Sequence, residues 1–559
     1  MRAGAVLLLL AAVAATAPDA HRVWRKQSQR LDKLEKQFWK DYQRRFSEAL
    51  ITFDQPFNNW EARKSDEKEV VNDFSDIRRL YEEYVGLQKA RGKIAAEYAT
   101  SGHARAGPTL KKELFETIKA AGKAEEELRD ARPLRFYTFD QRPGILRHGL
   151  AVRQQKLMAA LASVPGYAPE LMERGLREAA KRDLRGATQN SVALIDTLGM
   201  SGDPAVKPTL EQALQSKVSS LRIAALEALA RFGEEALPSL LPLLEDRSAA
   251  VRLATVEALR GIGSAKATPA LASRLADARG VLRAELVKTL EQLTAQKFGA
   301  APDAWKEWYE AYQEDIEAGR FDIKEVEVQE AERVDVPDEL SFYGVGSPSR
   351  NAIFVIDGSW VLSVPASVKK LKERYIRNWR GASPAWKKET PSHKQVLLRE
   401  LNKTLASMHT DAGFALTLLH ADFKIESLGA AKKLLRPTKR DVAKVQKRIK
   451  SQRANRGWCS QYQGLREALR LCGLDPEQDG DFGEPDADAI YLWNSGAPGG
   501  GRYMLPEPVV DAFARLNRFR RVRVYAIRIG NNKEDGELLM KGLAERSGGS
   551  YLWSSEPPE

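Results

Sequence analysis

Large apolar side chains recur at spacings of three, four and seven residues through the first part of the chain. One series runs from Trp24 to Leu50 and a second from Phe74 to Leu87, with charged residues between them. This spacing places the apolar side chains on one face of a helix. The pattern predicts long helices over residues 21–131. They form either a helical hairpin or coiled coil through which two copies of the chain dimerise, or a helical cap on the next domain.

Residues 132–188 are predicted to be a connecting helical segment, which begins in a stretch rich in Pro, Gly and Arg. The pattern then becomes a repeat, because residues 221–233 and 251–263 align position by position. A third copy starts at Leu282 and a weaker one near Asn190, so that the offsets are 31, 30 and 31 residues.

A proline recurs in the same register of this repeat, at Pro208, Pro238 and Pro269. Proline is favourable at the start of a helix, where its missing N–H would have no partner. Each unit is therefore predicted to be a helix pair that buries its apolar face by stacking on its neighbours. The units resemble HEAT repeats. Together with a helix that caps the open end through aromatic residues, they are predicted to form an α-solenoid over residues 189–320.

An acidic segment over residues 321–341 is predicted to be a linker, after which apolar strands alternate with amphipathic helices. This alternation predicts a mostly parallel sheet covered on both faces, a doubly wound, Rossmann-like α/β domain over residues 342–559. Ligands of such sheets bind at the carboxyl ends of the strands. The expected strands are 352–357, 414–420, 489–494, 522–529 and 550–553, and the expected helices are 364–378, 394–408, 438–451, 460–472, 507–517 and 534–547.

The first of these strands ends in Asp357-Gly-Ser359-Trp-Val361. This segment resembles the first metal-binding segment of von Willebrand factor A (VWA) domains, where the pattern is Asp-x-Ser-x-Ser. Two later segments resemble the other site loops of that family, with Cys459 where the family has a Thr and Ser495 where it has an Asp. The resemblance covers most of residues 342–553 and implies a metal-ion-dependent adhesion site (MIDAS) that holds Mg²⁺ or Mn²⁺.

Departures from the family pattern predict that this metal site is degenerate. Mg²⁺ requires hard oxygen ligands in near-ideal geometry. Val361 has no ligand atom, Cys459 offers a sulfur that suits softer metals, and Ser495 lacks the charge of the carboxylate it replaces. Only Asp357 and Ser359 keep the family's ligand chemistry, so no cofactor is expected. The alternative is a working adhesion module that depends on Mg²⁺ or Mn²⁺.

Three tryptophans fall beside the site segments, at Trp360, Trp458 and Trp493. They either plug a site that has lost its metal or form an aromatic surface for a partner, because tryptophan is a frequent anchor at protein interfaces. These three residues are the candidate partner-binding residues.

The first 20 residues have the pattern of a secretory signal peptide. Arg2 precedes a short apolar run and then small residues, and the run is shorter than the roughly 20 residues that a membrane span needs. The chain is therefore expected to be exported to the periplasm, the cell surface or the medium without spanning the membrane.

Cys472 lies about 20 Å beyond Cys459 along a predicted helix, too far for a disulfide. HEAT repeats joined to a VWA domain resemble a class of exported bacterial proteins.

Positive charge is concentrated in residues 361–460, which hold 23 Lys and Arg but only 7 Asp and Glu, a balance of +16 against +12 for the whole chain. This region is either a solvated surface or a binding surface for an anionic partner. Export makes an anionic cell-surface polymer the expected partner of that kind, and nucleic acid is not expected.

The chain contains no HExxH, GxSxG or GxxxxGK[ST] motif, and its six histidines show no metal-ligand spacing. It is therefore predicted not to be an enzyme. The sequence favours an interaction scaffold outside the cytoplasm that binds unidentified protein partners through the solenoid and the VWA-like domain. The alternatives are the metal-dependent adhesion module and a binder of anionic polymers through residues 361–460.

Overall fold

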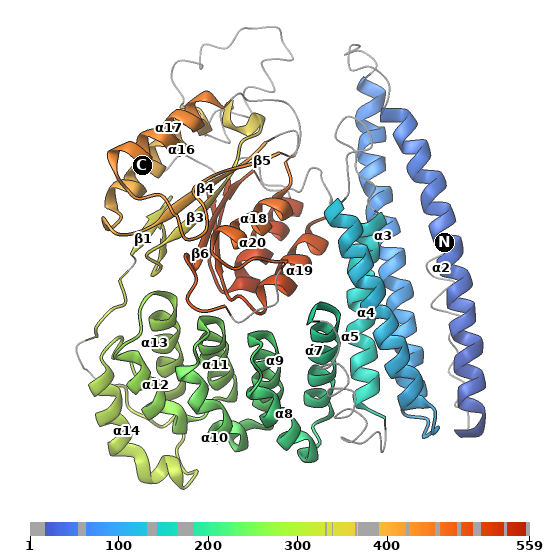
Figure 1. Cartoon of the computed structure of the whole chain (residues 1–559), viewed down its shortest axis with the longest axis horizontal. Coiled ribbons are helices and arrows are strands. Elements are labelled where there is room, and N and C mark those ends of the chain that lie inside the picture. Colours follow the sequence, from blue (N-terminus) through green and yellow to red (C-terminus); the bar gives the residue numbers. More distant parts are fainter. Residues whose placement is uncertain are drawn as a thin grey trace. The chain divides into compact units, whose positions relative to one another are not determined.

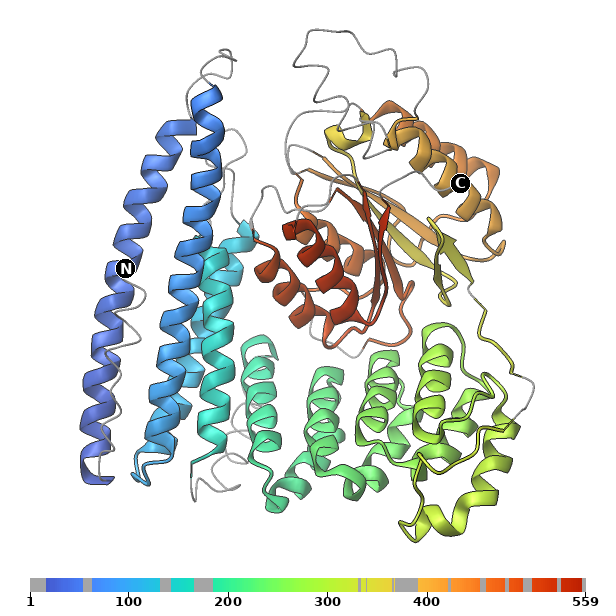
Figure 2. The ribbon, with the colours of Figure 1, turned by 180° about the vertical axis from the view of Figure 1, so that it is seen from behind.

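A computed structural model describes residues 17–53, 63–130, 142–164, 184–329, 333–337, 339–363, 366, 391–420, 424–452, 459–477, 482–495, 505–529 and 534–554. The chain divides into two compact units, residues 1–206 and 207–559. Figure 1 and Figure 2 show the helices and strands of each unit from opposite sides. Within the described ranges, none of the helices has both the length and the apolar character needed to cross a bilayer.

The first unit is helical, as the spacing of apolar residues predicts. Its helices are α2 (Ala17–Phe53), α3 (Arg63–Ala99), α4 (Ala106–Asp130), α5 (Arg142–Ala162) and α7 (Leu184–Ser201), followed by the short η1 (Pro204–Val206). Helix α5 packs on both α3 and α4, and α2 lies along α3. Residues 17–20 of the predicted signal peptide form the first turn of α2, and residues 1–16 lie outside the described part of the chain.

A buried arginine joins α2 to α3. Arg91 of α3 donates to Asp32 at 2.6 Å and to Glu35 at 2.7 Å, and Tyr84 donates to Glu35 at 2.9 Å. Burial opposes the charge of Arg91, but Glu35 and Asp32 outweigh it and raise the pKa of the guanidinium. Because Leu31, Phe38 and Tyr42 are buried as well, part of the apolar face of α2 packs within the chain. Dimerisation through these helices stays a prediction.

The solenoid of the second unit consists of stacked helix pairs. Its helices are α8 (Lys207–Leu214), α9 (Ser219–Leu229), α10 (Leu237–Leu240), α11 (Ala249–Ile262), α12 (Thr268–Leu275) and α13 (Gly280–Thr294), with short η2 (Ala230–Ala236), η3 (Leu241–Glu245) and η4 (Ala265–Ala267) between them. Pro208, Pro238 and Pro269 each lie in the first turn of a helix, as predicted. Gly263 ends α11 in the left-handed conformation, with φ 78°, which glycine adopts without strain.

Helix α14 (Pro302–Glu317) closes the far end of the solenoid and packs on α12. Trp305 and Trp308 are almost fully buried there, and the Trp305 ring N–H donates to the Gly299 carbonyl at 2.9 Å. Tyr309 is also buried and Tyr312 stacks near Trp308. The linker that follows is tied to this end, because the Val334 N–H donates to the Phe298 carbonyl at 3.1 Å.

The C-terminal domain is built around a six-stranded sheet with the order β5-β4-β3-β6-β7-β8. All neighbours are parallel except β4 and β5. Numbered along the domain, this is the order 3-2-1-4-5-6 of doubly wound sheets. The strands are β3 (Ala352–Asp357), β4 (Phe414–Leu419), β5 (Ile425–Leu428), β6 (Ala489–Asn494), β7 (Arg523–Ile529) and β8 (Tyr551–Ser554), and a hairpin of β1 (Leu340–Phe342) and β2 (Val345–Ser347) precedes them.

Helices cover both faces of this sheet, as the alternating pattern predicts. Helices α16 (His393–Ser407) and α17 (Lys439–Ser451) lie on one face, and α18 (Gln461–Leu471), α19 (Pro506–Asn517) and α20 (Glu534–Ser547) lie on the other (Figure 1). Most of these elements agree with the sequence prediction to within one or two residues. The predicted helix 364–378 falls almost wholly outside the described residues, where η5 (Trp360–Ser363) is the last element before the gap.

A layer of aromatic rings forms the core on the α16 side of the sheet. Phe354, Tyr491 and Tyr525 stack across three neighbouring strands. Trp493 continues the layer and meets the His393 ring edge-on at 6.1 Å between centroids. His393 is buried at the first turn of α16, next to the capping residue Ser392. Burial lowers the pKa of His393 to about 4.

This buried imidazole predicts a pH-dependent stability of the C-terminal domain. The unfolded chain binds a proton at about pH 6.5, whereas the folded chain resists protonation down to about pH 4. Stability should therefore rise with pH between these values, by at most about 3 kcal/mol, and level off above about pH 6.5. Scanning calorimetry of wild type and His393→Gln between those pH values would measure it. An unchanged pH dependence in the variant would contradict this account.

Candidate functional site

The structure brings four of the five predicted site positions together at the carboxyl ends of β3 and β6. Asp357 ends β3, in the middle of the sheet, where the chain turns to opposite sides to reach β4 and β6. Its carboxylate accepts from the Ser359 N–H at 3.0 Å, from the Cys459 thiol at 3.4 Å and from the Ser495 hydroxyl at 3.2 Å. The three segments that resemble the VWA site loops therefore meet at Asp357.

All three donors to the Asp357 carboxylate are neutral. Asp357 is 2% exposed and Cys459 is 4% exposed. Burial raises the pKa of the Cys459 thiol, and the negative charge of Asp357 raises it further. Cys459 therefore stays protonated and donates a hydrogen bond to the carboxylate. A buried carboxyl group needs hydrogen-bond partners, and the Ser359 N–H, the Cys459 thiol and the Ser495 hydroxyl provide them for Asp357.

These residues do not fit the Mg²⁺ or Mn²⁺ ion of a VWA site. Val361, at the position of the family's second Ser, is buried in the apolar core at 2% exposure. The protonated Cys459 thiol and the neutral Ser495 hydroxyl already bond to Asp357 and would be poor partners for a hard cation. Within the described ranges, no three His, Cys, Asp or Glu side chains lie close enough to share a metal ion.

The tryptophans do not form one group in the described part of the chain. Trp493 is fully buried in β6 and faces Tyr343 and His393 in the core, so its ring offers no surface to a partner. Its predicted place at the edge of the site is therefore wrong, because β6 continues to Asn494 and residue 493 points into the sheet's packed face. The side chain of Trp360 and all of Trp458 lie outside the described residues.

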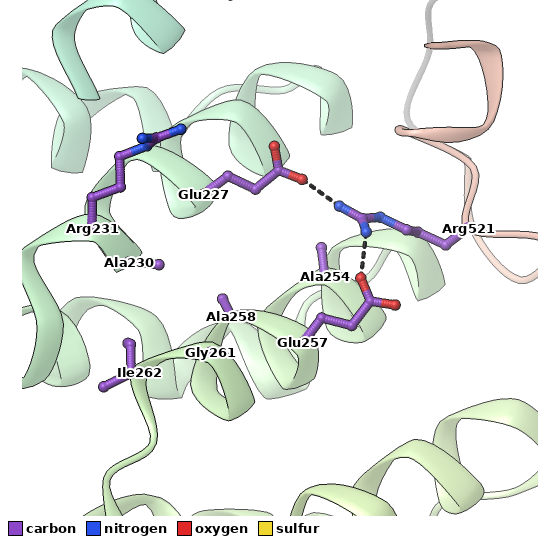
Figure 3. A pocket seen from close by; sticks show the side chains of 9 residues that line it. All are labelled: Glu227, Ala230, Arg231, Ala254, Glu257, Ala258, Gly261, Ile262 and Arg521. Atoms are coloured by element: carbon purple, nitrogen blue, oxygen red, sulfur yellow. Dashed lines mark hydrogen bonds and ion pairs between the residues drawn. The ribbon is translucent and has the colours of Figure 1, made fainter. Parts of the chain in front are cut away.

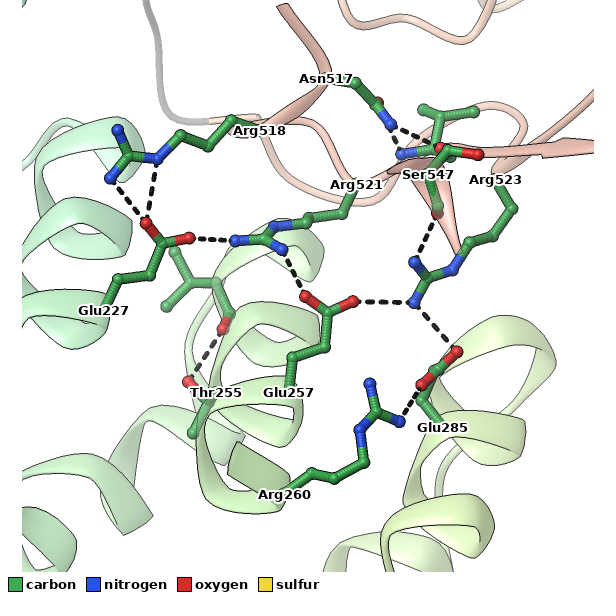
Figure 4. A network of polar contacts seen from close by, with 12 residues as sticks. Glu227, Thr255, Glu257, Arg260, Glu285, Asn517, Arg518, Arg521, Arg523 and Ser547 are labelled. Carbon is green, nitrogen blue, oxygen red and sulfur yellow. Dashed lines mark hydrogen bonds and ion pairs between the residues drawn. The ribbon is translucent and has the colours of Figure 1, made fainter. Parts of the chain in front are cut away.

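A second group of polar residues lies at the opposite, amino-end edge of the sheet, where the C-terminal domain meets the solenoid. Two arginines, Arg518 and Arg521, come from the turn between α19 and β7, and a third, Arg523, begins β7. They face three glutamates, one from each of α9, α11 and α13, which are equivalent helices of successive repeats (Figure 4). The glutamates are Glu227, Glu257 and Glu285. We call these six residues the ion-pair ladder.

Each glutamate of the ladder is shared between two arginines. Glu227 accepts from Arg518 at 2.6 Å and from Arg521. Glu257 accepts from Arg521 and, at 2.9 Å, from Arg523. Arg523 also lies 3.1 Å from Glu285, which in turn accepts from Arg260 of the solenoid at 2.5 Å.

The ladder is largely withdrawn from water at its centre. The side chains of Arg523 and Glu285 are 6% and 10% exposed. Burial would raise the pKa of Glu257, but Arg521 and Arg523 outweigh it and hold the pKa of this carboxyl below its ordinary value. Contact between the two domains therefore favours the ionised form of Glu257.

Local contacts hold the arginines in position. Asn517 clasps the turn, because its side chain donates to the Val522 carbonyl at 2.7 Å and accepts from the Val522 N–H at 3.0 Å. Arg523 also donates to the Ser547 carbonyl at 2.6 Å. Arg520 points inward and donates to the carbonyls of its own domain, so it takes no part in the ladder.

Two further contacts join the same edge to the solenoid. Asp488, just before β6, lies beside the first turn of α13, where the backbone of Val281 lowers the pKa of the Asp488 carboxyl group against the larger, opposite effect of burial. No side chain caps the start of this helix, so the C-terminal domain places an acidic side chain next to an uncapped helix N-terminus. Arg252 of α11 pairs with Glu484 of the C-terminal domain.

Beside the ladder is an open groove of about 370 Å³ between α9 and α11 (Figure 3). Small residues such as Ala254, Ala258 and Gly261 line it, and Glu227, Glu257 and Arg521 stand at its rim. The docked arginine thus forms part of the wall of this groove.

Sequence reasoning missed the ladder, although both halves are visible in the chain. Glu227 and Glu257 occupy the same register of two aligned repeats, and four arginines fall within residues 518–523. A recurring acidic residue on one solenoid face and a basic turn elsewhere are a complementary pair. That complementarity is the signal that could have suggested an internal contact.

Comparison with known proteins supports the repeat but no wider assignment. Residues 219–291 match the model of HEAT repeats. This confirms the sequence prediction for α9 to α13. No curated protein matches the chain.

A neutral site around Asp357 predicts that Asp357→Asn is well tolerated. The amide can still accept from the Ser359 N–H, so stability should stay within about 1 kcal/mol of wild type. Asp357→Ala leaves three donors without an acceptor and should cost about 1–3 kcal/mol. Calorimetric melting with and without Mg²⁺ or Mn²⁺ measures both effects. A metal-induced rise in melting temperature that Asp357→Asn abolishes would instead support the adhesion module.

The ladder predicts that Arg521→Glu loosens the contact between the domains. A carboxylate placed between Glu227 and Glu257 replaces attraction by repulsion and should weaken docking by about 2 kcal/mol or more. Hydrogen exchange of the full chain should then speed up in the first turn of α13, which Asp488 of the C-terminal domain covers in the docked arrangement. Lys541→Glu, an exposed reversal on α20, is the matched control. Equal exchange in both variants would contradict the docked arrangement.

Proposed function

We propose that the chain is a non-enzymatic protein-interaction scaffold in which the solenoid holds a VWA-like domain and presents its carboxyl-end edge to a protein partner. The observation that carries this proposal is the ion-pair ladder. It lies at the amino-end edge of the sheet, at the start of β7, whereas Asp357 and its neighbours lie at the opposite edge, where the parallel strands β3 and β6 end.

The HEAT match supports an interaction role, because stacked helical repeats offer extended surfaces that bind other proteins. In this chain the face formed by α9, α11 and α13 is engaged by the chain's own C-terminal domain. The solenoid would then hold the C-terminal domain in place, and a partner would bind to the carboxyl-end edge of the sheet, which the solenoid does not contact through the ladder.

The VWA-like part of the proposal draws support from topology and from the residues around Asp357. The doubly wound strand order puts Asp357 and Ser359 at the point where ligands of such sheets bind. The donors that surround Asp357 support partner binding without a metal ion. A Mg²⁺- or Mn²⁺-dependent adhesion module is the alternative, and the melting comparison above separates the two.

The cellular part of the proposal rests on the sequence. The signal-peptide pattern of residues 1–20 supports export, and the lack of catalytic motifs supports a binding role instead of an enzymatic one. A binding protein outside the cytoplasm, whose solenoid holds the C-terminal domain so that one edge of its sheet is presented, fits both the signal-peptide pattern and the lack of catalytic motifs.

Site-specific photocrosslinking in the producing cells tests this function. A photoreactive amino acid replaces Lys424, which is exposed beside the carboxyl end of β4, just before the antiparallel strand β5 begins, or Glu310, which is exposed on α14. We expect a discrete covalent adduct from position 424 and none from position 310.

The same adduct should become weaker when the probe at position 424 is combined with Arg521→Glu, because the domain is then no longer held in one orientation. Adducts from position 310 alone would place the partner on the solenoid and overturn the proposal. Equal adducts from both positions would indicate unspecific contact and overturn it as well.

A further inference from the structure

Helix α17 carries an unbroken basic surface. Its inner side is apolar, with Val445 and Ile449 fully buried. Its exposed side chains include five cations and no carboxylate. These cations are Lys439, Arg440, Lys444, Lys447 and Lys450. From Arg440 to Lys450 the spacings are four, three and three residues, which places these four cations along one side of the helix.

This charge pattern works against the stability of the helix itself. Like charges three or four residues apart repel one another, as at Arg440 and Lys444 or at Lys444 and Lys447. Lys439 and Arg440 also stand in the first turn, where the helix dipole disfavours cations. A helix face that only keeps a protein soluble usually mixes both signs of charge. The concentration of one sign therefore points to a binding role.

Nearby carboxylates do not neutralise the surface. Glu426 is paired with Arg448 and His420. Asp411 is paired with Arg350. Asp441, the one acid of α17, accepts from the Arg436 N–H at 3.1 Å. In the part of the chain that the structure describes, no ion pair links a carboxylate to the five cations of α17.

Further exposed lysines lie on segments next to α17. Lys432 and Lys433 are exposed in the loop that leads into α17, and Lys403 is exposed on the adjacent helix α16. From Arg440 to Lys450 the line of charge is about 15 Å long, at 1.5 Å per residue. This length allows contact with several successive anionic groups of a chain-like ligand.

The composition of this surface decides between kinds of anionic ligand. Single-stranded nucleic acid is usually held by aromatic rings on which bases stack, and a membrane-surface helix needs apolar side chains that enter the bilayer. The five exposed cations of α17 have no aromatic or large apolar exposed neighbour on that helix, because the exposed large hydrophobic residues of the described chain lie on other segments. The exposed surface of α17 is therefore suited to a ligand that is recognised by its negative charge, without base stacking or insertion into a bilayer.

We infer that α17, with the loop before it, is a binding surface for an acidic polysaccharide. The surface lies on the α16 side of the sheet, whereas the ladder arginines follow α19, which covers the other side (Figure 1). Polysaccharide binding thus needs neither release of the solenoid nor the protein partner proposed above. It adds a second contact, which would hold the scaffold to an anionic polymer.

The test uses the full chain and a size-defined heparin oligosaccharide as the probe, with binding measured by calorimetry at several salt concentrations. The variant Arg440→Glu, Lys444→Glu, Lys447→Glu reverses the centre of the line. Lys89→Glu, Lys119→Glu, Lys123→Glu changes the net charge equally at exposed positions of α3 and α4. We expect the first variant to bind at least about tenfold more weakly than wild type, and the second to bind within about twofold of it.

Wild-type binding should also weaken steeply as the salt concentration increases. This dependence on salt should be smaller in the glutamine variant Arg440→Gln, Lys444→Gln, Lys447→Gln, which removes the three charges instead of reversing them. An unchanged melting temperature in each variant confirms that it is folded. Equal losses in the two charge-reversed variants, or no binding by wild type at low salt, would overturn the proposal. Tighter binding to duplex DNA or to anionic lipid vesicles than to heparin would overturn the choice of polysaccharide.

Discussion

Sharing of each glutamate between two arginines is the interaction on which the arrangement of the second unit depends. Arg521 bridges Glu227 and Glu257, and Arg523 bridges Glu257 and Glu285. A planar guanidinium can donate to two carboxylates at once, which a lysine ammonium on a flexible stem does with less geometric specificity. Because every bridging arginine touches two successive repeats, the ladder fixes the C-terminal domain in one register along the solenoid.

Geometry explains why the arginines of the C-terminal domain fit the glutamates of the solenoid. Packed helices stand about 8–10 Å apart. Arg521 has a left-handed backbone, with φ 59°, and Arg523 begins strand β7. The two residues are close together in the chain, and their long side chains reach the glutamates of neighbouring repeats. A buried ion pair adds little net stability, since desolvation offsets the attraction, but a mismatched one is costly. The ladder therefore selects one docked orientation more than it adds to the free energy of docking.

Much of this architecture could be predicted from the sequence because it is periodic. The 30- and 31-residue offsets gave the solenoid, and the alternation of apolar strands with amphipathic helices gave the sheet. The neighbours of Asp357 could also be predicted, because motif resemblance places Cys459 and Ser495 on loops that meet at the carboxyl ends of the strands. These are features that local pattern encodes.

Features that depend on strand parity or on tertiary contact could not be predicted in the same way. Trp493 stands one residue before the strand end, and a shift of one residue moves a side chain to the other face of a sheet. Strand β5, Ile-Glu-Ser-Leu, is half-buried at the sheet edge and too short for a periodic signal. The ladder joins residues almost 300 positions apart, Glu227 and Arg521, and only the folded chain brings them together.

The C-terminal domain thus combines surfaces that differ in chemistry. Charge is neutralised within the chain at the amino-end edge, is uncompensated on α17, and is buried under neutral donors at Asp357. A cation could not bind Asp357 without displacing the thiol and hydroxyl that already bond to it, at the cost of leaving buried donors unpaired. In the proposals made here, electrostatic attraction therefore acts at α17, and a partner at the carboxyl-end edge recognises shape and hydrogen-bonding groups instead of a metal ion.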